Sequence, residues 1–299
     1  MISTDLICFG KLFKTICSIT DHQFSIETIK RLWDISKANR PSDQDVIVRA
    51  QLNNQKYTLL LTKTTHILLT HRKQGDRLVG SPGGHKLAKY AVNFEDPTEI
   101  EVIAIERTPQ TFTEGKVHKL CSKIPGVVTL KTWIFDKHKS YFLMEYCQNG
   151  TMGHIFSAEP SIEIAKRSIQ WIYDTAKSLN EIHKIGFIHG DIHPKNVFIT
   201  ANNDAKVADF GNAISRTAKN LRVDLDGFDS TLAMMVGYQT EAISSLNFLS
   251  YYFFNSETIK TILKLHNIYQ QFQQTHSLET LITSMEEQLA CPKHSEDCQ

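Results

Sequence analysis

Two acids and an amide, set between short apolar runs within residues 187–211, constrain this 299-residue chain more than any other feature. Asn196 follows Asp191 by five positions, and Asp209 follows Asp191 by 18, directly before a Phe-Gly pair. The apolar runs beside them read as short strands, which would hold the three side chains on turns. Carboxylate and amide oxygens are the ligands that a hard cation such as Mg²⁺ prefers. The alternative is a buried turn in which Asp and Asn occur by chance.

The pattern resembles the catalytic loop and the metal-binding Asp-Phe-Gly motif of the protein-kinase superfamily. The resemblance implies that Asp191 accepts or orients the proton of the substrate hydroxyl. It also implies that Asn196 and Asp209 hold Mg²⁺ and that the second cofactor is ATP. Phosphoryl transfer requires an aligned hydroxyl and neutralised phosphate charge rather than covalent chemistry from the protein, and these residue types suit that task.

The order of strand and helix signals agrees with an α+β, bilobal kinase-like fold, and the resemblance covers roughly residues 46–245. Alternating and continuous apolar runs predict a β-rich first half, and an apolar face at helical spacing predicts a long helix from Ser161 to Gly186. The strands are expected at 46–52, 57–61, 66–69, 86–92 and 141–147, with a turn at Asn53 and Asn54 and helices at 25–37 and 114–122.

Three parts follow from this organisation. Residues 1–45 form an N-terminal helical extension, residues 46–147 the β-rich N-lobe with its hinge strand, and residues 148–299 the helical C-lobe with a C-terminal tail. The extension and the long helical tail are candidate surfaces for an activating partner.

Residues 141–147 resemble the strand that enters the hinge between the two kinase lobes. Met144 then falls behind the adenine, and the backbone groups of Glu145 and Cys147 would bond the adenine edge. An ordinary buried strand is the alternative, because only backbone groups are required at a hinge.

The lysine that anchors the phosphates lies on the third strand of the family, and Leu87–Ala91 is the nearest match to its pattern. This match selects Lys89, with Glu114 of the following helix as its partner, 25 positions later. A rival alignment places residues 103–105 on the third strand, so that Glu106 stands where lysine belongs. In a third alternative Lys89 is an ordinary solvated strand residue.

The chain departs from the family in its glycines and in the segment after Asp-Phe-Gly. A full Gly-x-Gly-x-x-Gly is absent, and Gly80, Gly83 and Gly84 are expected to form an ordinary turn, with residues 61–66 as the hairpin that covers the phosphates. Gly190 replaces the arginine that usually pairs with a phosphorylated activation loop, which predicts no such switch. The shortened segment then leads to a helix in which Asp226 takes the buried acidic position.

His193 is the second departure within the loop, where serine/threonine kinases usually have lysine. The sequence His-Gly-Asp-x-His is closer to aminoglycoside and choline phosphotransferases. His193 would contact the transferred phosphate when protonated or would only orient the loop. Lys195 is a candidate for the missing positive charge.

Composition narrows the functional classes. Basic and acidic residues number 33 and 32, so neither nucleic-acid nor anionic-membrane affinity is indicated, and no apolar run is long enough for a membrane span. Six scattered cysteines and the lack of a basic, signal-like start favour a reduced, cytoplasmic protein or one exported into a host cell without a cleavable signal.

The first choice is therefore an ATP- and Mg²⁺-dependent serine/threonine protein kinase that acts on a protein substrate. It resembles compact kinases of viral and bacterial-effector type. The alternatives are a small-molecule kinase and a nucleotide-binding pseudokinase scaffold. A comparison of phosphate transfer to peptides and to aminoglycosides distinguishes the protein kinase from the small-molecule kinase.

Overall fold

The structure, a computed structural model, describes residues 4–19, 24–70, 87–94, 96, 100–106, 111–135, 140–158, 161–244 and 256–289. The chain forms two compact units. Unit 1 comprises Met1–Lys116 and Thr129–Tyr146, and unit 2 comprises Val117–Val128 and Cys147–Gln299. The boundary between them passes through the helix that carries Glu114 and through the predicted hinge.

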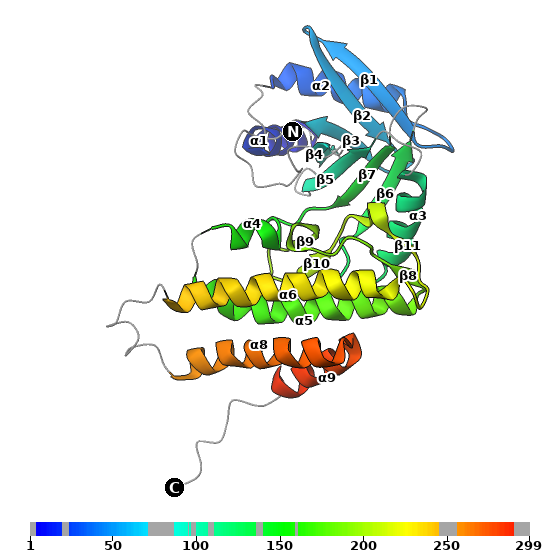
Figure 1. The fold of residues 1–299 in the computed structure, drawn as a ribbon. Helices are drawn as coiled ribbons and strands as arrows, with labels where there is room; N and C mark the ends of the chain where they lie inside the picture. The colour runs from blue at the N-terminus through cyan, green and yellow to red at the C-terminus, as the bar shows by residue number, and fades with distance from the viewer. Residues whose placement is uncertain are drawn as a thin grey trace. The chain divides into compact units, whose positions relative to one another are not determined.

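Unit 1 is built on a seven-stranded antiparallel sheet in the order β1-β2-β3-β4-β5-β7-β6 (Figure 1). The helix α3 (Thr111–Cys121) follows β5 in the chain. The strands are β1 (Val46–Leu52), β2 (Gln55–Leu61), β3 (His66–Thr70), β4 (Leu87–Asn93), β5 (Ile100–Glu106), β6 (Leu130–Phe135) and β7 (Ser140–Glu145).

The turn between β1 and β2 confirms the sequence prediction. Asn53 and Asn54 have φ values of 50° and 62°, so both occupy the left-handed region that a tight hairpin turn requires. Asparagine tolerates this region better than most residues, because its short side-chain amide can form hydrogen bonds with the nearby backbone. The turn fixes the register in which Val46 pairs with Leu61.

The N-terminal extension packs on the sheet through two helices, α1 (Thr4–Ile19) and α2 (Ile26–Ala38). Ser25 caps α2, because its hydroxyl accepts the Thr28 N–H at 3.1 Å. The shared core contains Leu12, Ile16, Ile29 and Leu32 from the helices and Tyr57, Leu59, Leu61, Leu68 and Val92 from the strands. The extension expected as a part of its own is thus a layer of unit 1. The helix α1 was not anticipated.

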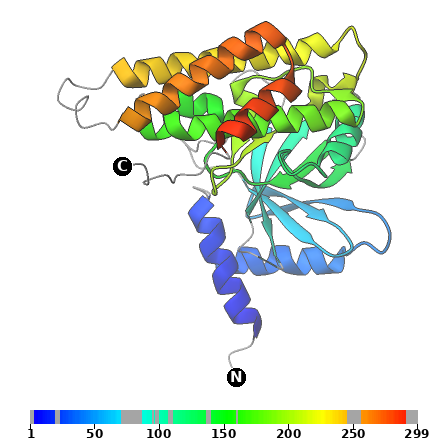
Figure 2. The same cartoon turned by 90° about the horizontal axis from the view of Figure 1, so that it is seen from below.

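Among its described residues, unit 2 is mainly helical, with two pairs of short strands, β8 (Phe187–Ile188) with β11 (Ile214–Ser215) and β9 (Val197–Ile199) with β10 (Ala205–Val207). Two long helices, α5 (Ile162–Lys184) and α6 (Leu221–Ser244), lie side by side, and α8 (Ser256–Thr275) and α9 (Leu278–Leu289) pack against them (Figures 1 and 2). The predicted helix from Ser161 to Gly186 is confirmed as α5. The short helix α4 comprises Met152–Phe156.

The core of unit 2 holds the loop that contains the predicted site. Ile172, Ala176 and Leu179 on one face of α5 are fully buried, as are Phe228 and Leu232 of α6. Ile192 of the loop belongs to the same cluster and anchors it. Within the described part of the chain, every helix is too short or too polar to cross a bilayer.

Candidate active site

The predicted catalytic loop is a single turn of 3₁₀ helix between β8 and β9. His193 is the N-cap of this turn, its Nδ1 accepts the Lys195 N–H at 3.2 Å, and Pro194 occupies the first helical position. The Asn196 N–H donates to the His193 carbonyl at 2.9 Å. Proline and a capping acceptor are the residues that start such a turn, so the local sequence fixes the loop.

Asp191 and Asn196 are joined directly by this turn. The Asn196 Nδ2 donates to the Asp191 carbonyl oxygen at 2.9 Å and to the carboxylate Oδ2 at 3.3 Å. Since the amide nitrogen is used in this way, the amide oxygen is the atom that Asn196 can offer to a cation. The predicted ligand fits Mg²⁺ in its chemistry.

The carboxylate of Asp191 is half-exposed and lies near His193. The His193 Nε2 is 3.7 Å from the Asp191 Oδ1, and the two side chains are 39% and 41% exposed. Because Nδ1 accepts a backbone hydrogen bond, a neutral His193 carries its proton on Nε2, the nitrogen that faces the acid. The structure thus brings the two predicted residues together.

Asp209 follows β10 in a left-handed conformation, with φ 68° and ψ 77°. Its Oδ1 accepts the Gly211 N–H at 3.3 Å, which starts a second short 3₁₀ turn. Phe210 is buried, and its ring centroid lies 4.9 Å from that of His118 and 5.0 Å from that of His189. The buried ring fixes the backbone on which the Asp209 carboxylate stands.

His189, two residues before Asp191, is fully buried and neutral. Its Nε2 lies 2.9 Å from the Ala208 carbonyl, which only accepts, and its Nδ1 accepts the Asp191 N–H at 3.3 Å. One nitrogen therefore donates and the other accepts, which is the neutral form. Burial lowers the pKa of His189 and outweighs the nearby carboxylates, which favour the charged form.

Asp224, and not Asp226, occupies the buried acidic position of α6. Its Oδ1 accepts the Gly190 N–H at 2.7 Å, and its Oδ2 accepts the His189 N–H at 2.7 Å and the His183 Nε2 at 2.8 Å. Burial alone would raise the pKa of Asp224, but these hydrogen bonds lower it below its ordinary value. Asp226 is exposed and 3.6 Å from the Arg222 Nε. The error is two residues along a helix, which turns a side chain by about 200°.

Gly190 has a steric reason to replace arginine in this chain. Its φ is +79°, and a Cβ built on it would lie 2.4 Å from the Asn212 carbonyl oxygen. The loop and the segment after Asp-Phe-Gly therefore touch through backbone.

The segment after Asp-Phe-Gly is short and held at several points. Ile214 and Ser215 form β11, which pairs with β8. The Arg216 N–H donates to the Gly186 carbonyl at 2.7 Å, and its Nη1 donates to the His183 carbonyl at 3.0 Å. The Asn220 Nδ2 donates to the Ser215 carbonyl at 2.9 Å. These bonds order the segment without a phosphate group.

The predicted hinge residues lie at the end of β7 and just after it. Met144 pairs with Val102 of β5. The Glu145 N–H donates to the Thr129 carbonyl at 3.0 Å, and its Oε1 accepts the Thr129 N–H at 2.7 Å. Cys147, the first residue of unit 2 after the hinge strand, is 3% exposed.

The register of the sheet places the position of Lys89 on one defined face. Lys89 pairs with Ile103, and Ile103 pairs with Leu143, so the three positions share a face. Leu143 belongs to a buried cluster with Leu60, Ile67, Leu69, Ala91, Ile134 and Tyr141.

The helix α3 packs on the other face. Trp133 and Phe142, which are register partners, stack there with ring centroids 5.9 Å apart. A Cβ on Gly115 of α3 would lie 2.7 Å from the Trp133 ring. Glu114, 7% exposed, precedes Gly115 in this helix. Lys89 and Glu114 thus belong to opposite faces, which argues against the predicted pair.

The alternative alignment fits the topology better. The strand directly before α3 is β5, which carries residues 103–105 and ends at Glu106, and β5 pairs with the predicted hinge strand β7.

Gly80, Gly83 and Gly84, and the C-terminal residues from 290 onward, lie outside the described residues. Residues 61–66, expected to cover the phosphates, join β2 to β3 through a turn in which the Thr62 N–H donates to the Thr65 carbonyl at 2.9 Å.

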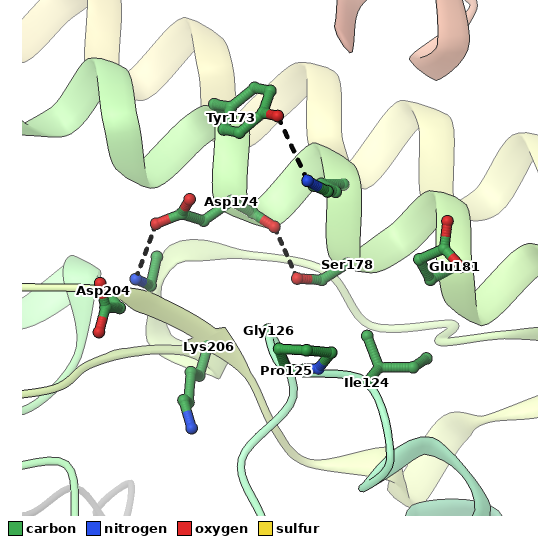
Figure 3. A pocket seen from close by; sticks show the side chains of 11 residues that line it. Ile124, Pro125, Gly126, Tyr173, Asp174, Ser178, Glu181, Asp204 and Lys206 are labelled. Atoms are coloured by element: carbon green, nitrogen blue, oxygen red, sulfur yellow. Dashed lines mark hydrogen bonds between the residues drawn. The ribbon is translucent and has the colours of Figure 1, made fainter.

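A cavity of about 450 Å³ lies elsewhere in unit 2, between α5, the loop after α3 and the start of β10 (Figure 3). Asp174 lines it, and its Oδ2 accepts the Ala205 N–H at 3.2 Å while burial raises the pKa of its carboxyl. None of Asp191, His193, Asn196 and Asp209 is among its lining residues. It is therefore distinct from the predicted catalytic loop.

Known proteins resemble the central part of the chain. The family model of the protein kinase domain matches residues 97–235. Aurora kinase B of Drosophila melanogaster is 32% identical over 106 residues, which cover 35% of this chain and 32% of that protein. Serine/threonine-protein kinase Nek3 of Mus musculus is 31% identical over 114 residues, covering 38% and 22%. Serine/threonine-protein kinase PknB of Mycobacterium tuberculosis is 41% identical over 71 residues, covering 24% and 11%.

The chain thus spans about a third or less of these relatives. The matched residues begin just before β5 and end within α6, so they include the predicted hinge strand, the catalytic loop and Asp-Phe-Gly. The β-rich unit 1 and the helical unit 2 match the two kinase lobes in their secondary structure. Residues 97–235 of this chain are thus similar to the protein kinase domain.

Proposed function

We propose that the protein is a serine/threonine protein kinase that uses ATP and Mg²⁺. The observation that carries the proposal is the link between Asp191 and Asn196 on a loop whose backbone is held by the buried Asp224. The similarity to serine/threonine kinases supports a protein hydroxyl as the acceptor.

The residues of the loop divide the work of phosphoryl transfer. The half-exposed Asp191 carboxylate would accept or orient the proton of the acceptor hydroxyl. The amide oxygen of Asn196 and the carboxylate of Asp209 would hold Mg²⁺, which neutralises phosphate charge when bound. Met144, Glu145 and Cys147 would contact the adenine. His193 would contact the transferred group or hold the loop.

We do not assign Lys89 as the phosphate anchor, because its register position and α3 lie on opposite faces of the sheet. Asp191, Asn196 and Asp209 do not depend on that assignment. Other cations near the site, such as Lys195 next to Asn196, would instead neutralise the negative charge of the phosphates.

Phosphate transfer from radiolabelled ATP with Mg²⁺ to a generic protein acceptor tests the proposal. The variant Asp209→Ala should lower the rate about a hundredfold or more, because metal stabilisation of the transferred charge contributes several kcal/mol. Asp226→Ala is the control, since that acid is exposed.

Three results would contradict parts of this proposal. Label on an aminoglycoside or choline and not on protein indicates a small-molecule kinase. Thermal stabilisation by nucleotide without transfer indicates a pseudokinase. Equal rates for Asp209→Ala and the wild type remove the metal assignment.

A further inference from the structure

The segment between Asp-Phe-Gly and α6 presents a basic surface beside the catalytic loop. Residues 214–223, here called the basic strip, contain three cations, Arg216, Lys219 and Arg222, and no acid, whereas the whole chain has a net charge of +1. All three cations are exposed. Of the acids that follow, Asp224 is buried and bonded to the loop, and Asp226 is exposed, with its Oδ1 3.6 Å from the Arg222 Nε.

Apolar side chains lie among these cations. Ile214 is 52% exposed and Val223 is 50% exposed, and both are among the most exposed large apolar side chains described in unit 2. A face that only meets water usually mixes acids with its bases. Exposed apolar side chains among charges of one sign instead indicate a contact surface.

The strip has a fixed shape before anything binds. Arg216 is tied to the end of α5 by the two bonds to Gly186 and His183. The Thr217 N–H donates to the Asn220 Oδ1 at 2.7 Å, and the Asn220 N–H donates to the Thr217 Oγ1 at 3.3 Å. A surface that is already ordered loses little conformational entropy on binding, which favours affinity.

The strip also adjoins the predicted proton acceptor. The Asn212 carbonyl approaches Gly190, the neighbour of Asp191, so closely that a Cβ there would lie at 2.4 Å. Two residues later the strip begins, and Ile214 pairs with Ile188 of the strand before the loop. A polypeptide whose hydroxyl reaches Asp191 therefore passes next to the strip.

We propose that the basic strip binds an acidic segment of the acceptor protein, next to the serine or threonine that is phosphorylated. Carboxylates of that segment pair with Lys219 and Arg222, and an apolar side chain packs on Ile214 or Val223. The inference rests on the proposed function and adds the class of substrate: proteins with acidic residues around the acceptor hydroxyl.

Equilibrium binding of two labelled peptides tests the inference without catalysis. The peptides share length, a central serine and one leucine, and differ in having four Asp or four Lys. The wild type should bind the acidic peptide at least about tenfold more tightly, and added salt should reduce the difference. Lys219→Glu with Arg222→Glu should reverse the preference.

The matched control is Lys166→Glu with Arg167→Glu in α5. It makes the same charge change, and Arg167 is paired with an acid four residues away, as Arg222 is. These residues are about 25 Å along the helix from its C-terminal end, at a rise of about 1.5 Å per residue. The control should keep the wild-type preference.

The inference fails if the wild type does not distinguish the peptides, or if the strip variant keeps the acidic preference. Stronger binding to anionic vesicles than to the acidic peptide, lost in the strip variant, would assign the strip to membranes and also overturn it. Phosphate transfer to a generic protein is measured in parallel. Its absence would count against the proposed function, while the binding preference still decides the inference.

Discussion

Gly190 combines a left-handed backbone with a contact that a larger residue cannot share. Its φ of +79° is unfavourable for residues with a Cβ, and Asn212 fills the space where that atom would lie. The loss of the family's arginine is thus compatible with the way this loop packs.

Gly190→Ala should destabilise unit 2 by about 1–3 kcal/mol, through backbone strain and displacement of Asn212. Gly237→Ala is the control, because that glycine is helical with open space around it, and alanine there should be neutral or stabilising. Urea unfolding measures both. Equal stability of the two variants would remove the steric explanation.

The grouping of the residues of the predicted catalytic loop was predictable because their spacing and local conformation agree. Asp191, Asn196 and the capping His193 lie within six positions, so one turn brings them together. Asp226 was predicted wrongly because sequence fixes the helix but not its rotation. The buried acid could have been found from the fact that Asp224 falls on the face with Phe228 and Thr231, four and seven residues later.

At the scale of elements, strands and helices with a clear apolar period were predicted well. The sequence of residues 99–105 fits either a strand or a helix. It forms the strand β5, because the type of such a continuous apolar run depends on its neighbours in the sheet. Counting back from β5, the segment between β3 and β4, with its four glycines, takes the sequence place of the Gly-rich loop. Register between distant strands cannot be read from one sequence, which is why Lys89 was favoured.

Lys89→Met distinguishes the two alignments. The register predicts that nucleotide affinity with Mg²⁺ changes less than about threefold, because β4 presents this position away from the face that carries α3. Titration with a fluorescent ATP analogue measures it, and Asp209→Ala provides the comparison. A loss as large as that of Asp209→Ala would restore Lys89 as the anchor.

The helices α1 and α2 supply a layer that the strands require. Leu32 is fully buried in the core that they share with β2, β3 and β4. Leu32→Ala should cost about 2–5 kcal/mol. Lys30→Ala, on the exposed face of the same helix, should cost almost nothing. Tryptophan fluorescence during urea unfolding reports the change, and equal behaviour of the two variants would show that the extension is dispensable.

At the scale of the whole molecule, the buried polar groups of the loop make stability depend on pH. The pKa of His189 lies below 6.5 in the folded chain, because burial disfavours the charged form. Between that value and 6.5 the unfolded chain binds more protons, so the free energy of unfolding falls as pH drops below about 6.5. The pKa of Asp224 is lowered from 3.8, and its contribution is lost only at more acidic pH.

His189→Gln keeps a donor for the Ala208 carbonyl and removes the titration. The wild type should lose stability more steeply than this variant between pH 7 and pH 5, in urea unfolding at constant ionic strength. Parallel curves would show that His189 is not the group responsible.

The ordered segment after Asp-Phe-Gly has a consequence for how a cell would manage such an enzyme. A kinase held in place by Arg216, Asn220 and a strand pair needs no upstream kinase to arrange that segment. If the chain is the proposed kinase, this segment is in place as soon as the chain folds. The rate of phosphorylation in the cell would then depend on the amount of this enzyme, set by its synthesis and degradation, and on the supply of acceptor proteins.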